Sequence, residues 1–523
     1  MSVKLSIDTG GRLLYNYGMK LKRITDAMLQ VCTGLYLAIS LILTFTVSDY
    51  YIFSRIGEFG FFFVISHWMK KCGLLLLPLA VWYGKKCCSD IAKYFLPLFV
   101  ILSCCTFGSF FDITMMTPDA TPAQKVFASI NEFMPKEANM ALYFIAAALE
   151  LICCALLFVK DGWRVNAKSF IYLPLAIVAL TPLNIFENFF DINTIPQDSF
   201  LRFRNFTLWH FLALAILAGF TVGCYYILKR FDRKKQQDFL IAGAIVLLIQ
   251  YHCKDSMLLG DGYNVYNNVF AALPLFICNI GVYVSSLSVI LKKRVLYAIS
   301  FFVHAVGALT VFIYFGKDEM SNYGIFCSYS ILYFCLTHCL LFGLCVLPTA
   351  LGHYKFRIKD CIIPLIYYCL VIVVATVASG LVSTFLTTYS YDGYTLTIGD
   401  YGKPGVDMSP PNFSFTQVNP LPIPFDYIPF TIGNYTFYLS YLIALYVAYV
   451  GLFWAFTGAY YAFLAVRRHI LGGLQQKSRQ KTEEIPIPLT LSETAVAESD
   501  GIPFENAETT AETIDEKEDE KVG

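Results

Sequence analysis

Charged residues are scarce in this chain of 523 residues. Only 15% of them are Asp, Glu, Lys or Arg, whereas 57% are apolar and the mean hydropathy is +0.58. Soluble domains contain about 25% charged residues and roughly 45–50% apolar ones. This composition excludes an ordinary soluble enzyme, a disordered protein and a collagen-like chain. It indicates an integral membrane protein.

Motifs for common cofactors and ligands are also missing. The 17 cysteines include no Cys-x-x-Cys pair, and the chain has no nucleotide-binding loop, haem motif or basic nucleic-acid patch. Most cysteines lie inside apolar runs, where a thiol usually acts as a small hydrophobic group. Cys335, His338 and Cys339 come closest to a ligand cluster, but a core position is the favoured interpretation. We therefore predict no cofactor, no metal and no nucleic-acid partner.

Long apolar runs fill most of the chain. A membrane-spanning helix needs ~20 apolar residues, and twelve segments approach this length. They are 28–48, 59–83, 94–112, 137–159, 169–190, 207–228, 238–253, 268–291, 294–315, 323–348, 360–386 and 433–463. The predicted fold is all-α, a polytopic membrane helical bundle of about 12 transmembrane helices.

Lys and Arg residues orient these spans. With twelve spans, every basic loop falls on one face of the membrane, which predicts that both termini are cytoplasmic. Residues 1–27 are polar and lack a signal-peptide pattern, so we expect a cytoplasmic N-terminal segment. The opposite face receives 113–136, 191–206 and 387–432. The last is rich in Tyr, Pro, Gly and Asp, and we expect it to form a structured outer loop.

The C-terminal segment differs in charge from the rest of the chain. Residues 482–523 contain thirteen acidic residues and two Lys, a net charge of −11, against about +12 for the remainder. The segment also has few aromatic residues. We predict that 467–523 is an acidic, disordered cytoplasmic tail, which either keeps the chain soluble or docks a protein partner.

The two halves of the apolar region share short sequences in the same order. The paired sequences are Leu142-Tyr143-Phe144 with Leu332-Tyr333-Phe334, and Lys85-Lys86 with Lys292-Lys293. These matches predict a tandem repeat of six plus six helices, 28–205 and 206–466. Because six is even, the repeats would be parallel, a plan known in membrane transporters.

Polar side chains inside predicted spans are the candidate site residues, because burying them in a bilayer is costly. In the second repeat these are Cys278, Asn279, His304 and His338. A Cys beside a His could form a nucleophile–base pair, in which the His takes the thiol proton. The alternative interpretation is that all four are ordinary core residues.

The first repeat carries no such pair. In the alignment of the halves, Ala148 stands at the position of His338, so we predict a degenerate, structural copy. Glu150, two residues later, is interpreted as a polar residue that hydrogen-bonds one helix to another.

Three further polar residues interrupt the second span, namely His67, Lys70 and Lys71. They either line a cavity, or they extend along the helix towards the membrane surface or mark a helix end that the predicted span misplaces. The last two interpretations are favoured from the sequence.

The second repeat resembles the YwaF-type bacterial integral membrane proteins, whose eukaryotic branch includes a cysteine-dependent acyltransferase of ether phospholipids. The resemblance rests on four short sequences, namely Phe206-Thr-Leu-Trp-His210, Leu273-Pro-Leu-Phe-Ile-Cys278, Leu336-Thr-His338 and Asn434-Tyr435. The sequence departs from that pattern at Phe276, where the signature has His, and at Asn279, where bacterial members often have Asp.

The resemblance implies that the protein transfers fatty acyl chains between phospholipids. Cys278 would accept the acyl group and His338 would be its base, with Asn279, His304 and His210 in support. Membrane lipids would then be its partners. The alternatives are a transporter or lipid carrier built from two parallel repeats, and a non-catalytic membrane scaffold.

Overall fold

The computed structural model describes most of the apolar region. The described backbone comprises 6–47, 49–108, 134–189, 196, 199–260, 273–313, 325–326, 328–385, 388–391, 394–397, 413–416 and 425–483. Most of the predicted outer segments and the acidic tail beyond residue 483 therefore lie outside the described residues. Contacts group Met1–Ala459 into one compact unit, and a second unit begins at Tyr460 within the last helix.

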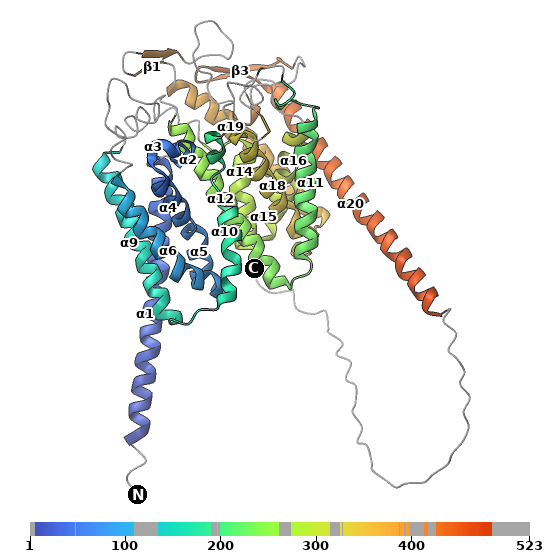
Figure 1. The fold of residues 1–523 in the computed structure, drawn as a ribbon. Helices are drawn as coiled ribbons and strands as arrows, with labels where there is room; N and C mark the ends of the chain where they lie inside the picture. Colours follow the sequence, from blue (N-terminus) through green and yellow to red (C-terminus); the bar gives the residue numbers. More distant parts are fainter. Residues whose placement is uncertain are drawn as a thin grey trace, which may run out of the picture. The chain divides into compact units, whose positions relative to one another are not determined.

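Helices make up the first half of the described chain (Figure 1). In order they are α1 (Ser6–Thr46), α2 (Asp49–Ser54), α3 (Ile56–Phe59), α4 (Phe61–Lys71), α5 (Gly73–Val81), α6 (Lys86–Thr106), α9 (Lys136–Asp161), η1 (Ala167–Tyr172), α10 (Leu173–Ala179) and η2 (Leu183–Asn188). α9 packs along α1 and α6, and α6 also packs on α4 and α5.

The second half is built in the same way. Its helices are α11 (Leu208–Leu228), α12 (Arg233–Gly260), α14 (Ile277–Leu291), α15 (Arg294–Ile299), η4 (Ser300–His304, a π-helical turn), α16 (Ala305–Ile313), α18 (Tyr329–Ala350), η5 (Ile358–Cys361), α19 (Ile362–Phe385) and α20 (Leu439–Glu483). α18 is central here, because it packs against α11, α12, α14 and α16.

The all-α, polytopic prediction is confirmed. Among the described residues, nine helical segments are long and apolar enough to cross a membrane. They begin at Lys22, Phe61, Lys86, Glu137, Leu208, Arg294, Ile331, Lys359 and Leu439. Burial differs widely among them: 67% of the Ile331–Ala350 window is buried, against 22% for Leu208–Leu228. The first is therefore an inner helix and the second a peripheral one.

The other three predicted spans take different forms. Segment 169–190 is divided into η1, α10 and η2, and the break before η2 falls at Pro182, which has no N–H to donate. Of segment 268–291 the structure describes 273–291, in which the 15-residue helix α14 begins at Ile277. Segment 238–253 lies within the longer helix α12. The repeat itself stays a prediction.

Two small antiparallel hairpins add the only described strands. β1 (Thr388–Tyr391) pairs with β2 (Tyr394–Thr397), and β3 (Pro429–Ile432) pairs with β4 (Tyr435–Tyr438). The second hairpin is tied to α19, because Asn434 donates from its backbone N–H to Ser383 Oγ and from its amide to the Ser383 carbonyl. The turn between β3 and β4 uses Gly433 at φ +61°, a conformation that glycine adopts readily.

The positive-inside pattern makes a prediction about topology. An epitope inserted at Gly84, in the exposed turn before α6, should be reached only from the cytoplasmic side. An epitope at Gly433, in the exposed β3–β4 turn, should be reached only from the opposite side. Antibody binding to intact and permeabilised cells measures both, and labelling of both sites from one side would contradict the twelve-span orientation.

Candidate functional site

A cluster of buried charged side chains lies in the first half of the molecule. Asp49 begins α2, and His67 and Lys71 occupy the last turns of α4. Asp49 and His67 are only 2% and 6% exposed. Ionisable groups at this depth are expensive to bury, so each must find a partner.

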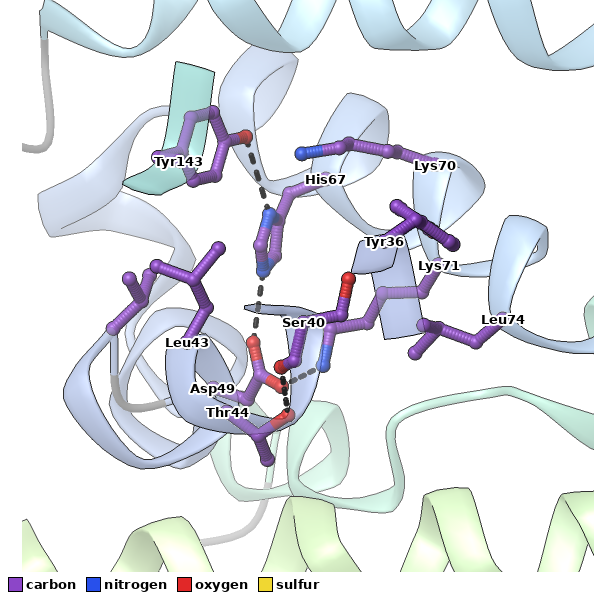
Figure 2. A pocket seen from close by; sticks show the side chains of 11 residues that line it. Tyr36, Ser40, Leu43, Thr44, Asp49, His67, Lys70, Lys71, Leu74 and Tyr143 are labelled. Carbon is purple, nitrogen blue, oxygen red and sulfur yellow. Dashed lines mark hydrogen bonds and ion pairs between the residues drawn. The ribbon is translucent and has the colours of Figure 1, made fainter. Parts of the chain in front are cut away.

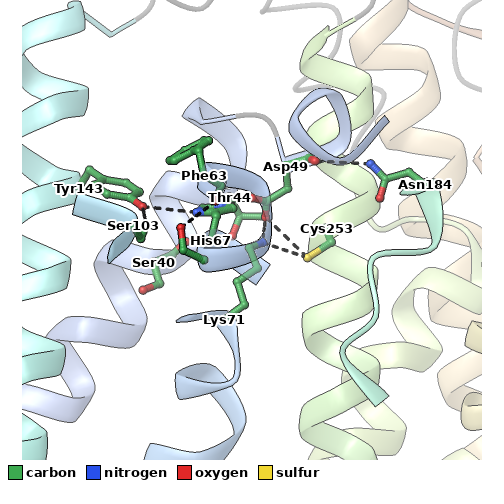
Figure 3. A network of polar contacts seen from close by, with 11 residues as sticks. Ser40, Thr44, Asp49, Phe63, His67, Lys71, Ser103, Tyr143, Asn184 and Cys253 are labelled. Carbon is green, nitrogen blue, oxygen red and sulfur yellow. Dashed lines mark hydrogen bonds and ion pairs between the residues drawn. The ribbon is translucent and has the colours of Figure 1, made fainter. Parts of the chain in front are cut away.

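Asp49 is the centre of this cluster (Figure 3). Its Oδ1 accepts a hydrogen bond from His67 Nε2 at 2.8 Å, and its Oδ2 forms an ion pair with Lys71. Cys253 on α12 lies beside this pair, since its sulfur is 3.4 Å from Lys71 Nζ and 3.7 Å from Asp49 Oδ2. The backbone carbonyl of Asp49 also accepts a bond from the Asn184 amide at 3.4 Å. One carboxylate thus joins α2, α4 and α12.

The hydrogen bonds fix the protonation pattern of His67. Because a carboxylate only accepts, His67 Nε2 carries the hydrogen and Nδ1 carries the lone pair. Nδ1 can then accept from the Tyr143 hydroxyl, 3.5 Å away. The Ser103 hydroxyl is in turn hydrogen-bonded to Tyr143. The result is a directed chain of donors that runs from Tyr143 through His67 to Asp49.

The prediction that His67, Lys70 and Lys71 extend to the membrane surface is wrong. All three line a cavity, and α4 ends at Lys71, inside the predicted span 59–83. His67 and Lys70 are buried, and Lys71 is held by Asp49. The sequence favoured snorkelling because it does not show that Asp49, which lies 22 residues before Lys71, is the acidic partner.

These side chains surround a small cavity of about 40 Å³ (Figure 2). Its walls combine polar and apolar groups, namely Tyr36, Ser40, Leu43, Thr44, Val47, Asp49, His67, Lys70, Lys71, Leu74 and Tyr143. Within the described part of the chain, no group of three or more His, Cys, Asp or Glu side chains is placed to hold a metal ion.

In the second half, Cys278 lies at the very start of a helix. The expected helix over 268–291 placed it about ten residues inside the membrane span, but α14 begins at Ile277, so Cys278 and Asn279 occupy its first turn. Backbone N–H groups in a first turn have no partner within the helix. Cys278 also lies within electrostatic reach of Cys345 on α18 and Tyr449 on α20.

His304 holds this first turn in place. Its Nδ1 donates to the Ile277 carbonyl at 3.0 Å, so its Nε2 carries the lone pair and accepts from the Tyr367 hydroxyl at 3.1 Å. The ring packs directly on Gly281, where a Cβ would lie 2.8 Å from Nδ1. His304 therefore connects the turn that carries Cys278 to α19.

His210 and His338 both contact Phe312. His210 accepts from the Phe206 N–H at 2.8 Å and donates from Nε2 to the Phe312 carbonyl at 2.6 Å. The His338 ring stacks on Phe334 at 4.1 Å and lies edge-on to Phe312 at 6.1 Å. His338 Nδ1 donates to the Phe334 carbonyl at 3.0 Å, which leaves the lone pair on Nε2.

The structure therefore brings His304 to the turn of Cys278, and His210 together with His338 to Phe312. His338 precedes Cys345 by seven residues in α18, a rise of about 10 Å. The pairing of Cys278 with His338 stays a prediction.

An apolar groove lies between α19 and α20. It has a volume of about 580 Å³ and is lined by Ile362, Leu365, Ile366, Cys369, Leu370, Val373 and Tyr446. Tyr446 stacks on Tyr368 at 5.9 Å, and Tyr368 stacks on Tyr449 at 4.1 Å. Three tyrosine rings thus lead from the groove to the neighbourhood of Cys278.

The sequence missed Asp49 and Cys253 as parts of a site. Asp49 falls just beyond the end of the first predicted span, where an acidic residue is unremarkable. Cys253 was one thiol among many in apolar runs. The one available signal was the pair Lys70-Lys71 within a span, which required a buried carboxylate somewhere else in the chain.

The buried pair predicts a strong effect of single substitutions. Lys71→Met should lower the free energy of unfolding by about 3–5 kcal/mol, because it leaves Asp49 buried without its cation. Asp49→Leu combined with Lys71→Met should cost less than the sum of the single changes. Asp238→Asn, which breaks the less deeply buried pair with Lys85, should cost about 1 kcal/mol and serves as the control. Denaturation in detergent of the two single variants, the double variant and the control measures these free energies. Additive losses for Asp49→Leu and Lys71→Met would refute the coupling.

The close contact between Gly281 and His304 predicts that a side chain at position 281 destabilises the protein. Gly281→Val should destabilise the protein by about 1–3 kcal/mol, since the added atoms would collide with the His304 ring. Gly219→Ala on α11 is the control, because a Cβ there would meet nothing within 4 Å. Equal unfolding temperatures for both variants would show that α14 does not pack on His304 as described.

Comparison with known proteins covers the second half of the molecule. Residues 205–454 match the model of the TMEM164 family. No curated protein and no solved structure matches the chain. Combined with the apolar helices, this match identifies a multi-pass membrane protein whose residues 205–454 are similar to the TMEM164 family.

Proposed function

We propose that the protein transfers fatty acyl chains between phospholipids through Cys278. The observation that carries the proposal is the position of this thiol. It lies in the first turn of α14, near Tyr449, at the end of the tyrosine stack that leads to the apolar groove. A lipid tail in the groove would bring its ester towards the thiol from within the membrane.

The start of α14 also suits charge that develops during acyl transfer. First-turn N–H groups and the helix dipole stabilise a thiolate and the oxyanion of a tetrahedral intermediate. Asn279, the next residue, adds an amide donor in the same turn. In this proposal His304 positions the turn through the Ile277 carbonyl, and His210 positions α16 through Phe312.

His338 is the proposed base. Its hydrogen bond to Phe334 leaves the lone pair on Nε2, which is the form of imidazole that accepts a proton. The resemblance of 206–463 to cysteine-dependent acyltransferases supports the same assignment.

The proposed reaction has two balanced steps. The Cys278 thiol loses its proton to His338, and the sulfur attacks the ester carbonyl of a phospholipid. The C–O ester bond breaks, and the lysophospholipid leaves with the proton that His338 returns. An acceptor hydroxyl then attacks the thioester, its proton passes through His338 to the sulfur, and the free thiol is restored.

Trapping of the acyl-enzyme tests the proposal. The purified protein in nanodiscs is incubated with a phospholipid that carries an alkyne-labelled acyl chain, and the labelled peptide is identified by mass spectrometry. We expect a hydroxylamine-sensitive label on Cys278, absent in Cys278→Ala. His338→Gln should slow labelling by about 10²-fold or more.

Cys345→Ser is the matched control, because Cys345 is a buried thiol of the same region that has no role in the proposed chemistry. It should keep the label. Unchanged labelling of Cys278→Ala, or no thioester in the wild type with any phospholipid donor, would refute acyl transfer through this residue.

Transport is the second candidate, and the Asp49 cluster favours it. Buried ionisable side chains linked by hydrogen bonds are typical of the pathways in transporters. Uptake of solutes or flipping of labelled lipids by proteoliposomes would distinguish it, since an acyltransferase needs neither activity.

A further inference from the structure

The tyrosine stack beside the apolar groove ends on a hydroxyl that contacts the backbone of another helix. Tyr449 of α20 donates its hydroxyl hydrogen to the Val303 carbonyl, and the Gly307 backbone hydrogen-bonds to the same oxygen. A Cβ at Gly307 would lie 3.2 Å from this hydroxyl, so α20 approaches the backbone closely here. Val303 and Gly307 are four residues apart, the spacing of one α-helical hydrogen bond. Tyr449 therefore bridges one turn of backbone.

The bridged backbone adjoins an irregular turn. In η4 the Ala305 N–H bonds to the Ser300 carbonyl, five residues back rather than four, which is the pattern of a π-helix. A π turn accommodates one residue more than the same stretch of α-helix. Its conversion into α geometry would rotate the two flanks against each other by about 100°. The contacts that hold this turn therefore decide where its side chains point.

His304, the last residue of the π turn, reaches the segment that carries Cys278. Its Nδ1 donates to the Ile277 carbonyl at 3.0 Å, and Ile277 directly precedes Cys278. The same segment packs on Gly307, where a Cβ would lie 2.9 Å from Ile277 Cγ2. Rotation of the π turn would remove His304 from this carbonyl. The position of Cys278 is therefore tied to the Tyr449 hydroxyl through the π turn.

The other end of this connection lies in the groove. Tyr446 lines the groove and stacks on Tyr368, which stacks on Tyr449. Tyr368 and Val303 belong to one hydrophobic cluster, and Ile277 packs against it. Side chains in such a close-packed cluster do not move independently. A molecule in the groove therefore acts on the ring whose hydroxyl holds the π turn.

We propose that Tyr449 is a positioning residue that couples the presence of a lipid chain in the groove to the exposure of the Cys278 thiol. With a lipid chain in place, the tyrosine stack is held, the Tyr449 hydroxyl keeps the π turn, and the first turn of α14 stays closed around the thiol. Without it the stack loosens, because only 17% of the α20 window Leu439–Phe463 is buried.

This inference rests on the proposed function, in which the groove receives a phospholipid and Cys278 carries the acyl group. A turn that closes when lipid is present would keep water away from the thioester and so limit its hydrolysis. The coupling therefore gives the groove a second role, beyond that of an entry for the lipid tail.

Cysteine alkylation of the full-length chain in detergent tests the coupling, because a thiol lies at each end of the connection. Cys369 is exposed in the groove and reports its occupancy, and Cys278 reports the state of its own turn. The probe is a phospholipid with two ether-linked alkyl chains, which has no ester and cannot acylate Cys278. We expect this lipid to slow the reaction of both thiols with N-ethylmaleimide by about fivefold or more, measured by mass spectrometry of the two peptides.

Tyr449→Phe removes the hydroxyl but keeps the ring in the stack. The lipid should still protect Cys369 in this variant, whereas Cys278 should lose its protection. Thr457→Val is the matched control, because it removes a hydroxyl of α20 that donates to the Phe453 carbonyl of the same helix, and it should behave as the wild type. Full protection of Cys278 in Tyr449→Phe would overturn the proposal, since the lipid would then shield the thiol directly. A wild type in which the lipid leaves Cys278 unprotected would overturn it as well.

Tyr368→Leu provides a second variant if Tyr449→Phe does not fold. It interrupts the stack and should also leave Cys369 protected and Cys278 unprotected. The alkylation experiment does not depend on acyl transfer. Coupled protection without a thioester from any ester-linked phospholipid would refute only the proposed reaction, and a thioester without coupled protection would refute only the role of Tyr449.

Discussion

The arrangement of the first half depends on the burial of Asp49. A carboxylate at 2% exposure is tolerated only because an imidazole, an ammonium and a thiol converge on it. The desolvation cost of such groups is comparable with their attraction, so the pair contributes more to register than to net stability. Any shift of α2 along α4 would separate the charges and leave them buried alone. The cluster thereby fixes where the short helix α2 lies against its neighbours.

The second half uses neutral histidines for the same purpose. His210 and His304 each engage both ring nitrogens, one as donor to a backbone carbonyl and one as acceptor. Each therefore joins elements that are distant in the sequence without introducing a charge. His338 differs, because its Nδ1 bond to Phe334 closes within its own helix.

Hydropathy predicted most of the architecture because the bilayer imposes a length on apolar helices. It failed where local chemistry overrides apolarity. Pro182 interrupts an apolar run, and α14 begins only at Ile277, which places Cys278 in the first turn rather than in mid-helix. The site was harder to predict, since the contact between Lys71 and Asp49 depends on how α2 folds back beside α4. The spacing of residues along the sequence does not predict that α2 folds back beside α4.

The contacts of α12 show how the two halves depend on each other. α12 belongs to the region similar to the TMEM164 family, yet Cys253 joins the Asp49 cluster and Gln250 donates to the carbonyls of Ala179 and Thr181. Lipid could not satisfy these polar groups, because hydrocarbon offers no hydrogen-bond partners. On this face, α12 is therefore covered by residues of the first half and not by lipid. The helices before residue 205 are therefore structural partners of the second half, and a chain without them would expose polar side chains of α12 to lipid.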